Sequence, residues 1–302
     1  MDKVLIIGSK GFIGQHAYQH FKQQPNYLVW ACDVVTEYND PNYFQIDASN
    51  SDYSEVFEAE LFDFCINCSG AASVPDSLKH PLRDFSLNTY NVIKILDVIR
   101  RYTPLCHFIN LSSAAVYGNP TSLPISEISI IRPVSPYGQH KLIAEMLCQQ
   151  YHDYFGLSVC SLRIFSAYGP GLQKQLLWDT FQKSGQASSI LLFGNGNESR
   201  DFIFINDIIH AIKLVMKKGE FDGRAYNLGS GTETTVAEAV GMLLKALNYN
   251  GTVSFSGTRR TGDPVAWRAD ISQLSLLGFS PIVSIQEGIK LYVKWLRETG
   301  LL

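Results

Sequence analysis

The 302-residue chain lacks the features that mark several classes of protein. No uninterrupted apolar run approaches the roughly 18 residues of a membrane span, so we expect no membrane partner. There is no cluster of lysine and arginine, and the formal net charge is -3, which argues against nucleic acid as a main partner. Repeats, low-complexity tracts and flexible linkers are absent, and the first apolar stretch is too short for a signal peptide.

Cysteine is sparse, with six residues in the chain. Cys65 and Cys68 form a C-x-x-C pair, but no second pair and no histidine cluster completes a zinc site. The pair falls in a strand-like run that leads into a turn, so buried structural thiols are the better interpretation. We therefore expect no metal site, reduced core cysteines and a cytoplasmic location.

A glycine-rich turn near the start is the most informative feature that is present. Gly8, Gly11 and Gly14 follow the apolar run Val4–Ile7, and a helical pattern extends from about residue 12 to 24. Glycines in this context let the backbone approach a pyrophosphate, which a helix N-terminus attracts. The pattern predicts a dinucleotide-binding turn. A strand-to-helix turn without a nucleotide is the alternative.

Asp33 strengthens the nucleotide interpretation. It ends the next apolar run, 19 residues after Gly14, where a carboxylate can bind a ribose diol. That carboxylate would repel a 2′-phosphate and so favours NAD. Lys10, in the same turn, keeps NADP possible, and a solvated loop lysine is the alternative.

Short apolar runs alternate with helical patterns through the first half of the chain. Strands are expected over 3–7, 28–32, 43–46, 62–68, 106–111 and 158–165, and helices over 12–24, 51–59, 85–102 and 137–155. This alternation predicts an α/β fold with a doubly wound parallel sheet of the Rossmann type. Beyond about residue 166, turns rich in Gly, Pro and Asn indicate a smaller α/β substrate-binding lobe. We place the dinucleotide-binding domain at 1–165 and the lobe at 166–302, with an approximate boundary that the chain can cross.

Candidate catalytic residues cluster around a second motif. Tyr137 and Lys141 are four residues apart at a helix start, so they share one helix face. A nearby ammonium favours the phenolate and lowers the pKa of a tyrosine. Ser112 and Ser113 end the strand near 106–111, where one of them can bond the reacting oxygen and the other can cap a turn. The arrangement suits proton transfer coupled to hydride transfer.

The chain resembles an extended short-chain dehydrogenase/reductase of the nucleotide-sugar epimerase/dehydratase family, of the UDP-glucose 4-epimerase kind. The resemblance runs almost end to end. It rests on the glycine turn, Asp33, Asp47, the turn 67–74, Asn88, Ser113 with 116–118, Tyr137-x-x-x-Lys141, and the segments 163–166, 199–202 and 260–263.

The resemblance implies a role for each matching residue. Phe12 and Ile13 amides would bind the cofactor pyrophosphate, Asp33 the adenosine ribose, and Asp47 with Ala48 the adenine. The remaining cofactor contacts would be Gly8, Gly11, Gly14, Cys68, Ser69, Gly70, Asn88 and Phe165. The catalytic group would be Ser113, Tyr137 and Lys141, and Tyr137 and Lys141 would also contact the cofactor.

The resemblance also implies a substrate site and an assembly. Arg200 and Arg260 would bind the diphosphate of a nucleotide sugar. Phe193 would lie near the base, Asp263 near the nucleoside, and Ser166 near the phosphates or the sugar. A surface ion pair is the alternative for each arginine. Relatives often form homodimers through the two helices that here span 85–102 and 137–155, and they supply sugars for surface polysaccharides.

Two departures from the family pattern reduce the number of reactions that the chain is expected to catalyse. Ala114 and Ala115 stand where dehydratases carry an Asp-Glu pair, so loss of water across C5–C6 is not expected. Ser166 replaces a common asparagine, which changes a sugar or phosphate contact. The favoured function is a nucleotide-sugar 4-epimerase that works through a 4-keto intermediate. The close alternative is a reductase of a dTDP-, UDP- or CDP-4-keto-6-deoxyhexose. A decarboxylating relative and a cofactor-binding sensor without turnover are less favoured.

Overall fold

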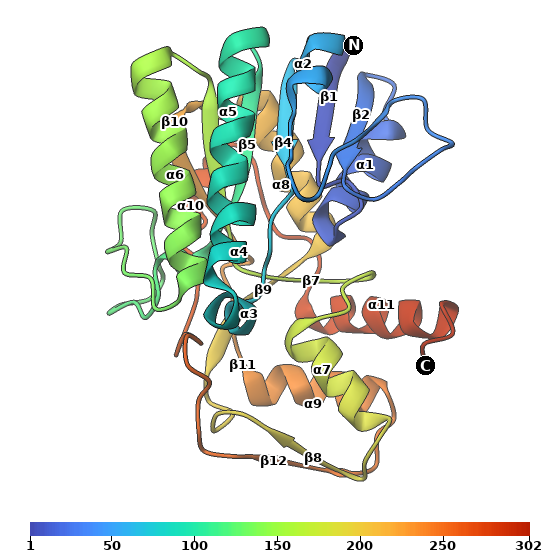
Figure 1. Ribbon diagram of the computed structural model, residues 1–302. Coiled ribbons are helices and arrows are strands. Elements are labelled where there is room, and N and C mark those ends of the chain that lie inside the picture. The colour runs from blue at the N-terminus through green and yellow to red at the C-terminus, as the bar shows by residue number, and fades with distance from the viewer.

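A parallel sheet of seven strands forms the centre of the computed structural model, which describes residues 1–302 (Figure 1). Its strand order is β10-β6-β5-β4-β1-β2-β3. The strands are β1 (Asp2–Ile7), β2 (Tyr27–Asp33), β3 (Tyr43–Gln45), β4 (Phe64–Asn67), β5 (His107–Ser113), β6 (Val159–Ile164) and β10 (Asp222–Leu228). The predicted doubly wound parallel sheet is confirmed, and six of its strands lie where the apolar runs predict them.

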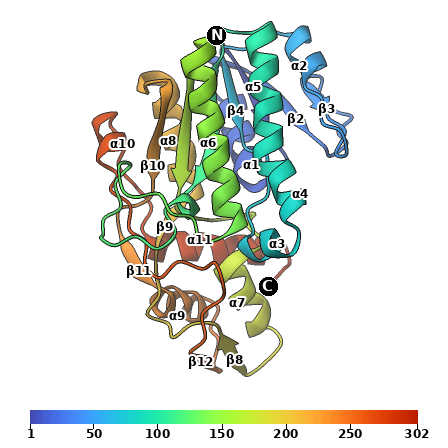
Figure 2. The same ribbon diagram turned by 60° about the vertical axis from the view of Figure 1, so that its left-hand side comes forward.

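Helices cover both faces of this sheet because side chains of a strand alternate between them. Val4 and Ile6 of β1 face α1 (Phe12–Lys22) and α8 (Ile205–Lys218). Leu5 and Ile7 face the opposite layer, made by α2 (Ser54–Ala59), α5 (Asn91–Tyr102) and α6 (Pro136–Phe155). Helices α5 and α6 lie side by side in both ribbon views (Figures 1 and 2).

The seventh strand comes from the second half of the chain. Strand β10 pairs with β6, and α8, which precedes it, packs beside α1. The chain thus crosses from the smaller lobe back to the large sheet, as the approximate boundary allowed. The sequence pattern did not predict β10, because only its last three residues, Tyr226–Leu228, are buried.

The smaller lobe lies below the carboxyl ends of the large sheet in Figure 1. It contains a three-stranded sheet, β11-β9-β7, and a two-stranded sheet, β12-β8. Its strands are β7 (Ser166–Tyr168), β8 (Ser189–Leu192), β9 (Ser199–Phe204), β11 (Glu233–Thr235) and β12 (Thr252–Phe255), and its helices are α7 (Gln175–Ser184), α9 (Val236–Ala246) and α11 (Ile285–Glu298). The short helix α10 (Ser272–Leu276) packs against β10 of the large sheet (Figure 2). The helices α7 and α11 both pack against α9.

The segment before α5 differs from the single helix expected over 85–102. Short helices α3 (Val74–Lys79) and α4 (Pro81–Phe85) come first, followed by a π-helical turn over Ser86–Tyr90. Such turns widen a helix locally and are frequent at functional sites. Here the turn contains Asn88. No helix of the molecule has the length and apolar character needed to cross a membrane.

Candidate active site

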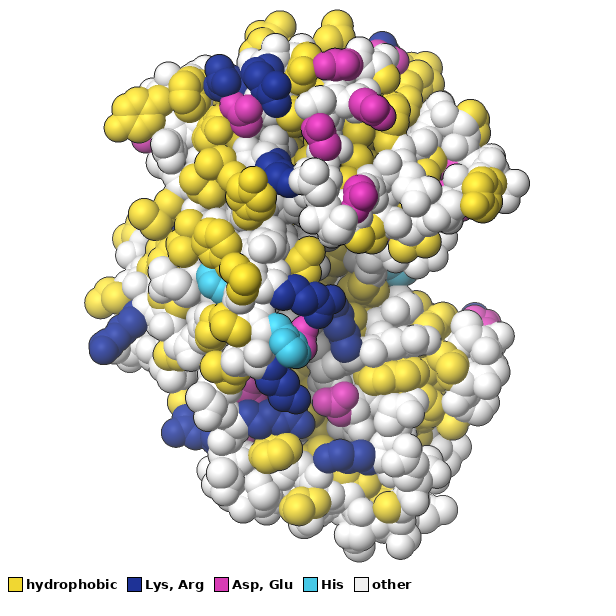
Figure 3. All heavy atoms as spheres, viewed as in Figure 1, with side chains coloured by type: hydrophobic (Ala, Val, Ile, Leu, Met, Phe, Trp, Pro, Cys, Tyr) yellow, Lys and Arg dark blue, Asp and Glu magenta, His cyan; other side chains and the backbone are white.

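A cavity of about 590 Å³ separates the large sheet from the smaller lobe. In the space-filling view the surface is hollowed between the upper and lower parts of the molecule, and Lys and Arg side chains gather beside the hollow (Figure 3). The cavity lies at the carboxyl ends of the parallel strands, where ligands of open α/β sheets bind. Thirteen predicted site residues line it: Ile13, Cys68, Ser69, Gly70, Ser113, Tyr137, Lys141, Phe165, Ser166, Phe193, Arg200, Arg260 and Asp263.

The glycine turn connects β1 to α1 by a very close backbone approach. Gly8 has φ +77°, and a Cβ there would lie 2.6 Å from the Ser69 amide nitrogen. A Cβ on Gly14 would lie 2.1 Å from the Gly8 carbonyl oxygen. Glycine is therefore required at both positions. Gly11 precedes α1 without a capping side chain, so the first amides of the helix, Phe12 among them, stay open to an anionic ligand.

Asp33 closes this turn at the end of β2. Its carboxylate accepts hydrogen bonds from the Lys10 amide at 2.8 Å and the Val34 amide at 2.7 Å. The Lys10 ammonium does not point to an open site, because it pairs with Glu37 at 2.7 Å. A 2′-phosphate beside Asp33 would meet this second carboxylate as well, so the charges fit NAD better than NADP.

The other predicted cofactor residues surround the same edge. Asp47 and Ala48 follow β3, which pairs with β2. The Asp47 carboxylate is exposed and accepts a hydrogen bond from the Ser49 amide at 2.6 Å. Asn88 is buried, and its Oδ1 has no hydrogen-bond partner. An orphaned buried acceptor beside the cavity is consistent with a group that is completed by a ligand.

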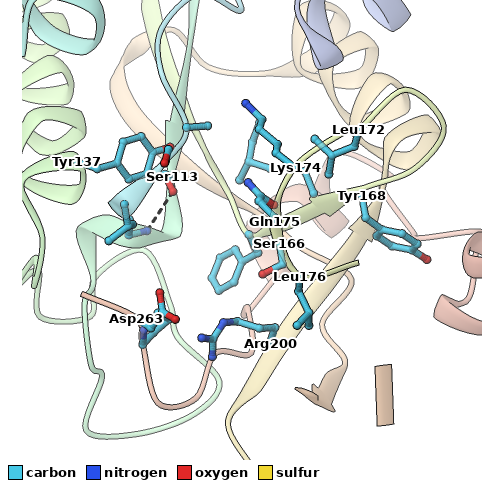
Figure 4. A pocket seen from close by; sticks show the side chains of 18 of the residues that line it. Ser113, Tyr137, Ser166, Tyr168, Leu172, Lys174, Gln175, Leu176, Arg200 and Asp263 are labelled. Atoms are coloured by element: carbon cyan, nitrogen blue, oxygen red, sulfur yellow. Dashed lines mark hydrogen bonds between the residues drawn. The ribbon is translucent and has the colours of Figure 1, made fainter. Parts of the chain in front are cut away.

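Ser113 and Tyr137 point toward one another across the cavity wall (Figure 4). Ser113 ends β5, and its Oγ also accepts a hydrogen bond from the Ala115 amide at 3.2 Å. Tyr137 lies in the first turn of α6, which Ser135 caps by accepting from the Gly138 amide at 3.1 Å. A Cβ on Gly138 would lie 2.5 Å from the Ala115 carbonyl oxygen, so glycine lets α6 approach the end of β5 closely.

Burial controls the proton affinity of both candidate catalytic residues. It raises the pKa of Tyr137 to about 12, although a hydrogen bond with Ser113 lowers it. It lowers the pKa of Lys141 to about 8. The Lys141 ammonium donates to the Leu111 carbonyl oxygen at 2.8 Å. The lowered tyrosine pKa that the sequence suggested is absent in the protein alone, since desolvation of the phenolate is the largest effect.

The predicted substrate residues converge on the far side of the cavity. Arg200 is partly buried, and its Nη1 donates to the Ser199 carbonyl oxygen at 2.7 Å. The Arg260 guanidinium lies 4.4 Å from the Phe193 ring centroid and 4.0 Å from Asp179. Burial raises the pKa of Asp263, while Arg200 and Arg260 lower it. The two guanidiniums leave donors for a diphosphate.

Trp267, Lys174 and Gln175 are among the cavity residues that the sequence analysis missed. Trp267 supports Arg200, whose guanidinium lies 5.8 Å from the ring centroid. Lys174 and Gln175 begin α7 and line the cavity. Lys174 makes no ion pair, and the surrounding walls lower the pKa of its ammonium. No local motif marks these positions, because only the tertiary fold brings α7 to the sheet.

A glycine turn, a carboxylate at the end of β2 and a Ser-Tyr-Lys group are the features expected of a dinucleotide-dependent enzyme of the short-chain dehydrogenase/reductase class. The chain belongs to the NAD dependent epimerase/dehydratase family, whose model matches residues 4–229. It is thus an enzyme of the extended branch of that class, and its cofactor is NAD.

Individual relatives agree with this assignment. The chain is 28% identical to a putative UDP-glucose 4-epimerase of Methanocaldococcus jannaschii, over 98% of this chain and 99% of that protein. It is 26% identical to UDP-glucuronate 4-epimerase 4 of Arabidopsis thaliana, over 97% of this chain and 74% of the relative. A solved UDP-glucuronic acid 4-epimerase from Bacillus cereus, in complex with UDP-glucuronic acid and NAD, superposes with a TM-score of 0.90 at 26% identity, covering 98% of this chain and 99% of the other.

Proposed function

We propose that the protein is a nucleotide-sugar 4-epimerase, which inverts the configuration at C4 of a nucleotide-diphosphate hexose. The observation that carries the proposal is the position of Ser113 and Tyr137. They line one cavity with Ile13, which follows the glycine turn that we propose for the dinucleotide, and with Arg200 and Arg260, which we propose for the diphosphate. The relatives named above carry out or are assigned this reaction.

The residues divide the chemistry between them. Tyr137 accepts the proton of the C4 hydroxyl and later returns it, while Ser113 bonds the same oxygen. Lys141 supplies a buried positive charge on the same helix face as Tyr137. NAD, when bound, would supply the hydride acceptor and donor for C4, and its positive charge would favour the phenolate form of Tyr137. Arg200 and Arg260 hold the diphosphate, so the sugar can turn while its nucleotide stays bound.

Each proposed ligand contact can be tested by a separate substitution. We propose Gly8, Gly11, Phe12, Ile13 and Gly14 for the pyrophosphate, and Asp33, Asp47 and Ala48 for the adenosine. Ser166, Phe193 and Asp263 are proposed as further substrate contacts.

The first experiment is to denature the purified protein and identify any released nucleotide by mass and stoichiometry. Near-equimolar NAD is expected, because a closed redox cycle never needs to release its cofactor. The purified protein should then convert a UDP-hexose to its C4 epimer without added nicotinamide. Empty protein that oxidises NADPH with a 4-keto-6-deoxyhexose substrate would instead establish the reductase, which the relatives do not favour.

We further propose a homodimer. The large apolar side chains Leu82, Phe85, Tyr90 and Met146 are exposed on α4, the π-helical turn and α6. These elements pack against one another, so the residues are available to a partner surface. Light scattering should give twice the 33.8 kDa of one chain. A Leu82→Glu, Met146→Glu variant should be monomeric, and a parent protein that is itself monomeric would refute the dimer.

The cellular setting is also a proposal. All six cysteines are free, and five are buried, which suits a reducing cytoplasm. Supply of a sugar for surface polysaccharide follows from the family resemblance. Fractionation of cells and analysis of their surface sugars after deletion of the gene would test both points.

A further inference from the structure

A buried polar chain connects the surface of α6 to the cofactor side of the cavity. The His140 ring nitrogen Nδ1 lies 2.6 Å from Asp84 Oδ1. Asp84 Oδ2 accepts a hydrogen bond from Asn88 Nδ2 at 3.1 Å. The Asp84 side chain is only 3% exposed and that of His140 12% exposed, so the contact is sheltered from water. None of the steps proposed above uses Asp84 or His140.

The chain of donors and acceptors fixes which way the Asn88 amide faces. A carboxylate can only accept hydrogen bonds, so Asp84 binds the NH₂ end of Asn88 and the Nδ1–H of His140. The carbonyl end, Oδ1, then faces Gly70, where a Cβ would lie 2.5 Å from it. Gly70 lines the cavity, and Asn88 Oδ1 has no partner in the protein.

An acceptor that is buried and left without a donor has a cost, typically about 1–3 kcal/mol. The reverse orientation would place the NH₂ group toward Gly70 and the carbonyl against Asp84, where two acceptors would face each other. Asp84 and His140 therefore hold the Asn88 carbonyl oxygen on the cofactor side, which lowers the stability of the protein without its ligand.

We propose that Asp84 and His140 are positioning residues for NAD, which act through Asn88 by holding its carbonyl oxygen toward Gly70. The negative charge of Asp84 also raises the pKa of both Tyr137 and Lys141. A dinucleotide or the water it retains supplies the missing donor. The inference concerns cofactor binding and holds for an epimerase or a reductase alike.

The test is a swap of the two side chains. In Asp84→Asn with His140 still donating through Nδ1, the new amide accepts from His140 and offers its NH₂ group to Asn88, which turns its carbonyl away from the cavity. We expect the dissociation constant for NAD, measured by titration calorimetry on nucleotide-stripped protein, to rise about tenfold, the size of one hydrogen bond to a buried group. Asn88→Asp places two carboxylates together and should weaken binding similarly.

The double variant Asp84→Asn, Asn88→Asp restores every bond. The amide now at position 84 donates to the carboxylate now at position 88 and accepts from His140. The second oxygen of that carboxylate remains an acceptor directed toward Gly70. We expect the NAD affinity to return to within about threefold of the parent, and His140→Phe to show an intermediate loss, because Asp84 then lacks one of its two anchors. Thermal unfolding of each protein, measured without NAD, checks that the changes in affinity are not losses of folding.

Two results would overturn the inference. One is Asp84→Asn protein that folds and binds NAD as tightly as the parent. The other is a double variant whose affinity loss equals the sum of the single losses, since additivity means that the two side chains do not act through each other. Should the double variant not fold, an unchanged NAD affinity in folded His140→Phe would also count against the proposal. The amount of epimer formed plays no part in these measurements, so failure here leaves the proposed function standing.

Discussion

Tyr137 transfers the proton in the proposed reaction. A phenylalanine at this position differs from tyrosine only in lacking the hydroxyl group. Tyr137→Phe should lower kcat by at least about a hundredfold, within the range of general acid–base catalysis. NAD should remain bound in the variant, because the ring still fills its buried place. Nucleotide release after denaturation and a direct epimerisation assay measure the two effects. Full turnover in the variant would exclude Tyr137 as the base.

Lys141 gives stability a particular pH dependence. The unfolded chain holds a proton on this lysine up to about pH 10.5, whereas the folded protein releases it near pH 8. Between these values the unfolded state binds more protons, so a rise in pH stabilises the fold. Compared with Lys141→Met, the parent should gain about 2–3 kcal/mol across this window. Urea unfolding at pH 7.5 and 10 measures the difference, and a constant difference would mean that the buried lysine keeps its ordinary pKa.

Lys174 provides a test of the sugar. Its ammonium lines the cavity without an ion pair, so a negatively charged hexose would find a free cation there. Lys174→Ala should raise KM for UDP-glucuronate about tenfold and change that for UDP-glucose little, because only the uronate carries a carboxylate. Lys183→Ala is the matched control, since Lys183 also lines the cavity but donates to the Leu191 carbonyl oxygen at 2.7 Å. Equal effects on both sugars would exclude a carboxylate contact.

At the scale of elements, a buried ion pair joins β6 to α6. Arg163 donates to Glu145 at 2.7 Å, and both side chains are at least nine-tenths buried. Arg163 also donates to the Tyr117 hydroxyl at 2.8 Å and the Glu127 carbonyl oxygen at 3.0 Å. The pair ties the helix of Tyr137 and Lys141 to the sheet.

Removal of one partner from this pair should destabilise the protein strongly. Arg163→Met leaves Glu145 buried without a positive charge, which we expect to cost about 3–5 kcal/mol of unfolding free energy. The double variant Arg163→Met, Glu145→Leu should recover much of that loss, because no charge is left unpaired. Urea unfolding of the single and double variants measures this, and a single-variant loss below about 1 kcal/mol would contradict it.

Elements marked by a local sequence pattern were predictable. Elements and contacts that form only through distant parts of the chain were not. The first six sheet strands are short apolar runs between turns, and Ser113, Tyr137 and Lys141 belong to motifs whose spacing fixes their faces. Strand β10 contains Gly223 and Arg224, and only its last three residues are buried. It therefore has no regular pattern of apolar residues. The Asp84–His140 pair joins residues 56 positions apart and has no pattern in the chain.

At the scale of the whole molecule, we propose that NAD and the nucleotide sugar occupy opposite parts of one cavity. A substitution in one binding region should therefore weaken only the ligand that binds there. Arg200→Met should weaken UDP binding at least tenfold and leave bound NAD unchanged, because one forked ion pair is lost. Asp33→Asn should do the opposite, since it alters only the ribose site. Calorimetric titration with UDP and nucleotide release measure both, and loss of both ligands in either variant would contradict the division.

The late position of strand β10 in the sequence has a consequence for folding during translation. Every residue of β6 is buried in the finished molecule, and β10 forms one of its two neighbours. A ribosome that has delivered the first six strands must still add more than fifty residues before β10 emerges. During that interval β6 is an open edge with unpaired backbone groups, able to join a strand of another nascent chain. Chaperone demand should therefore be highest while residues 165–228 are being translated.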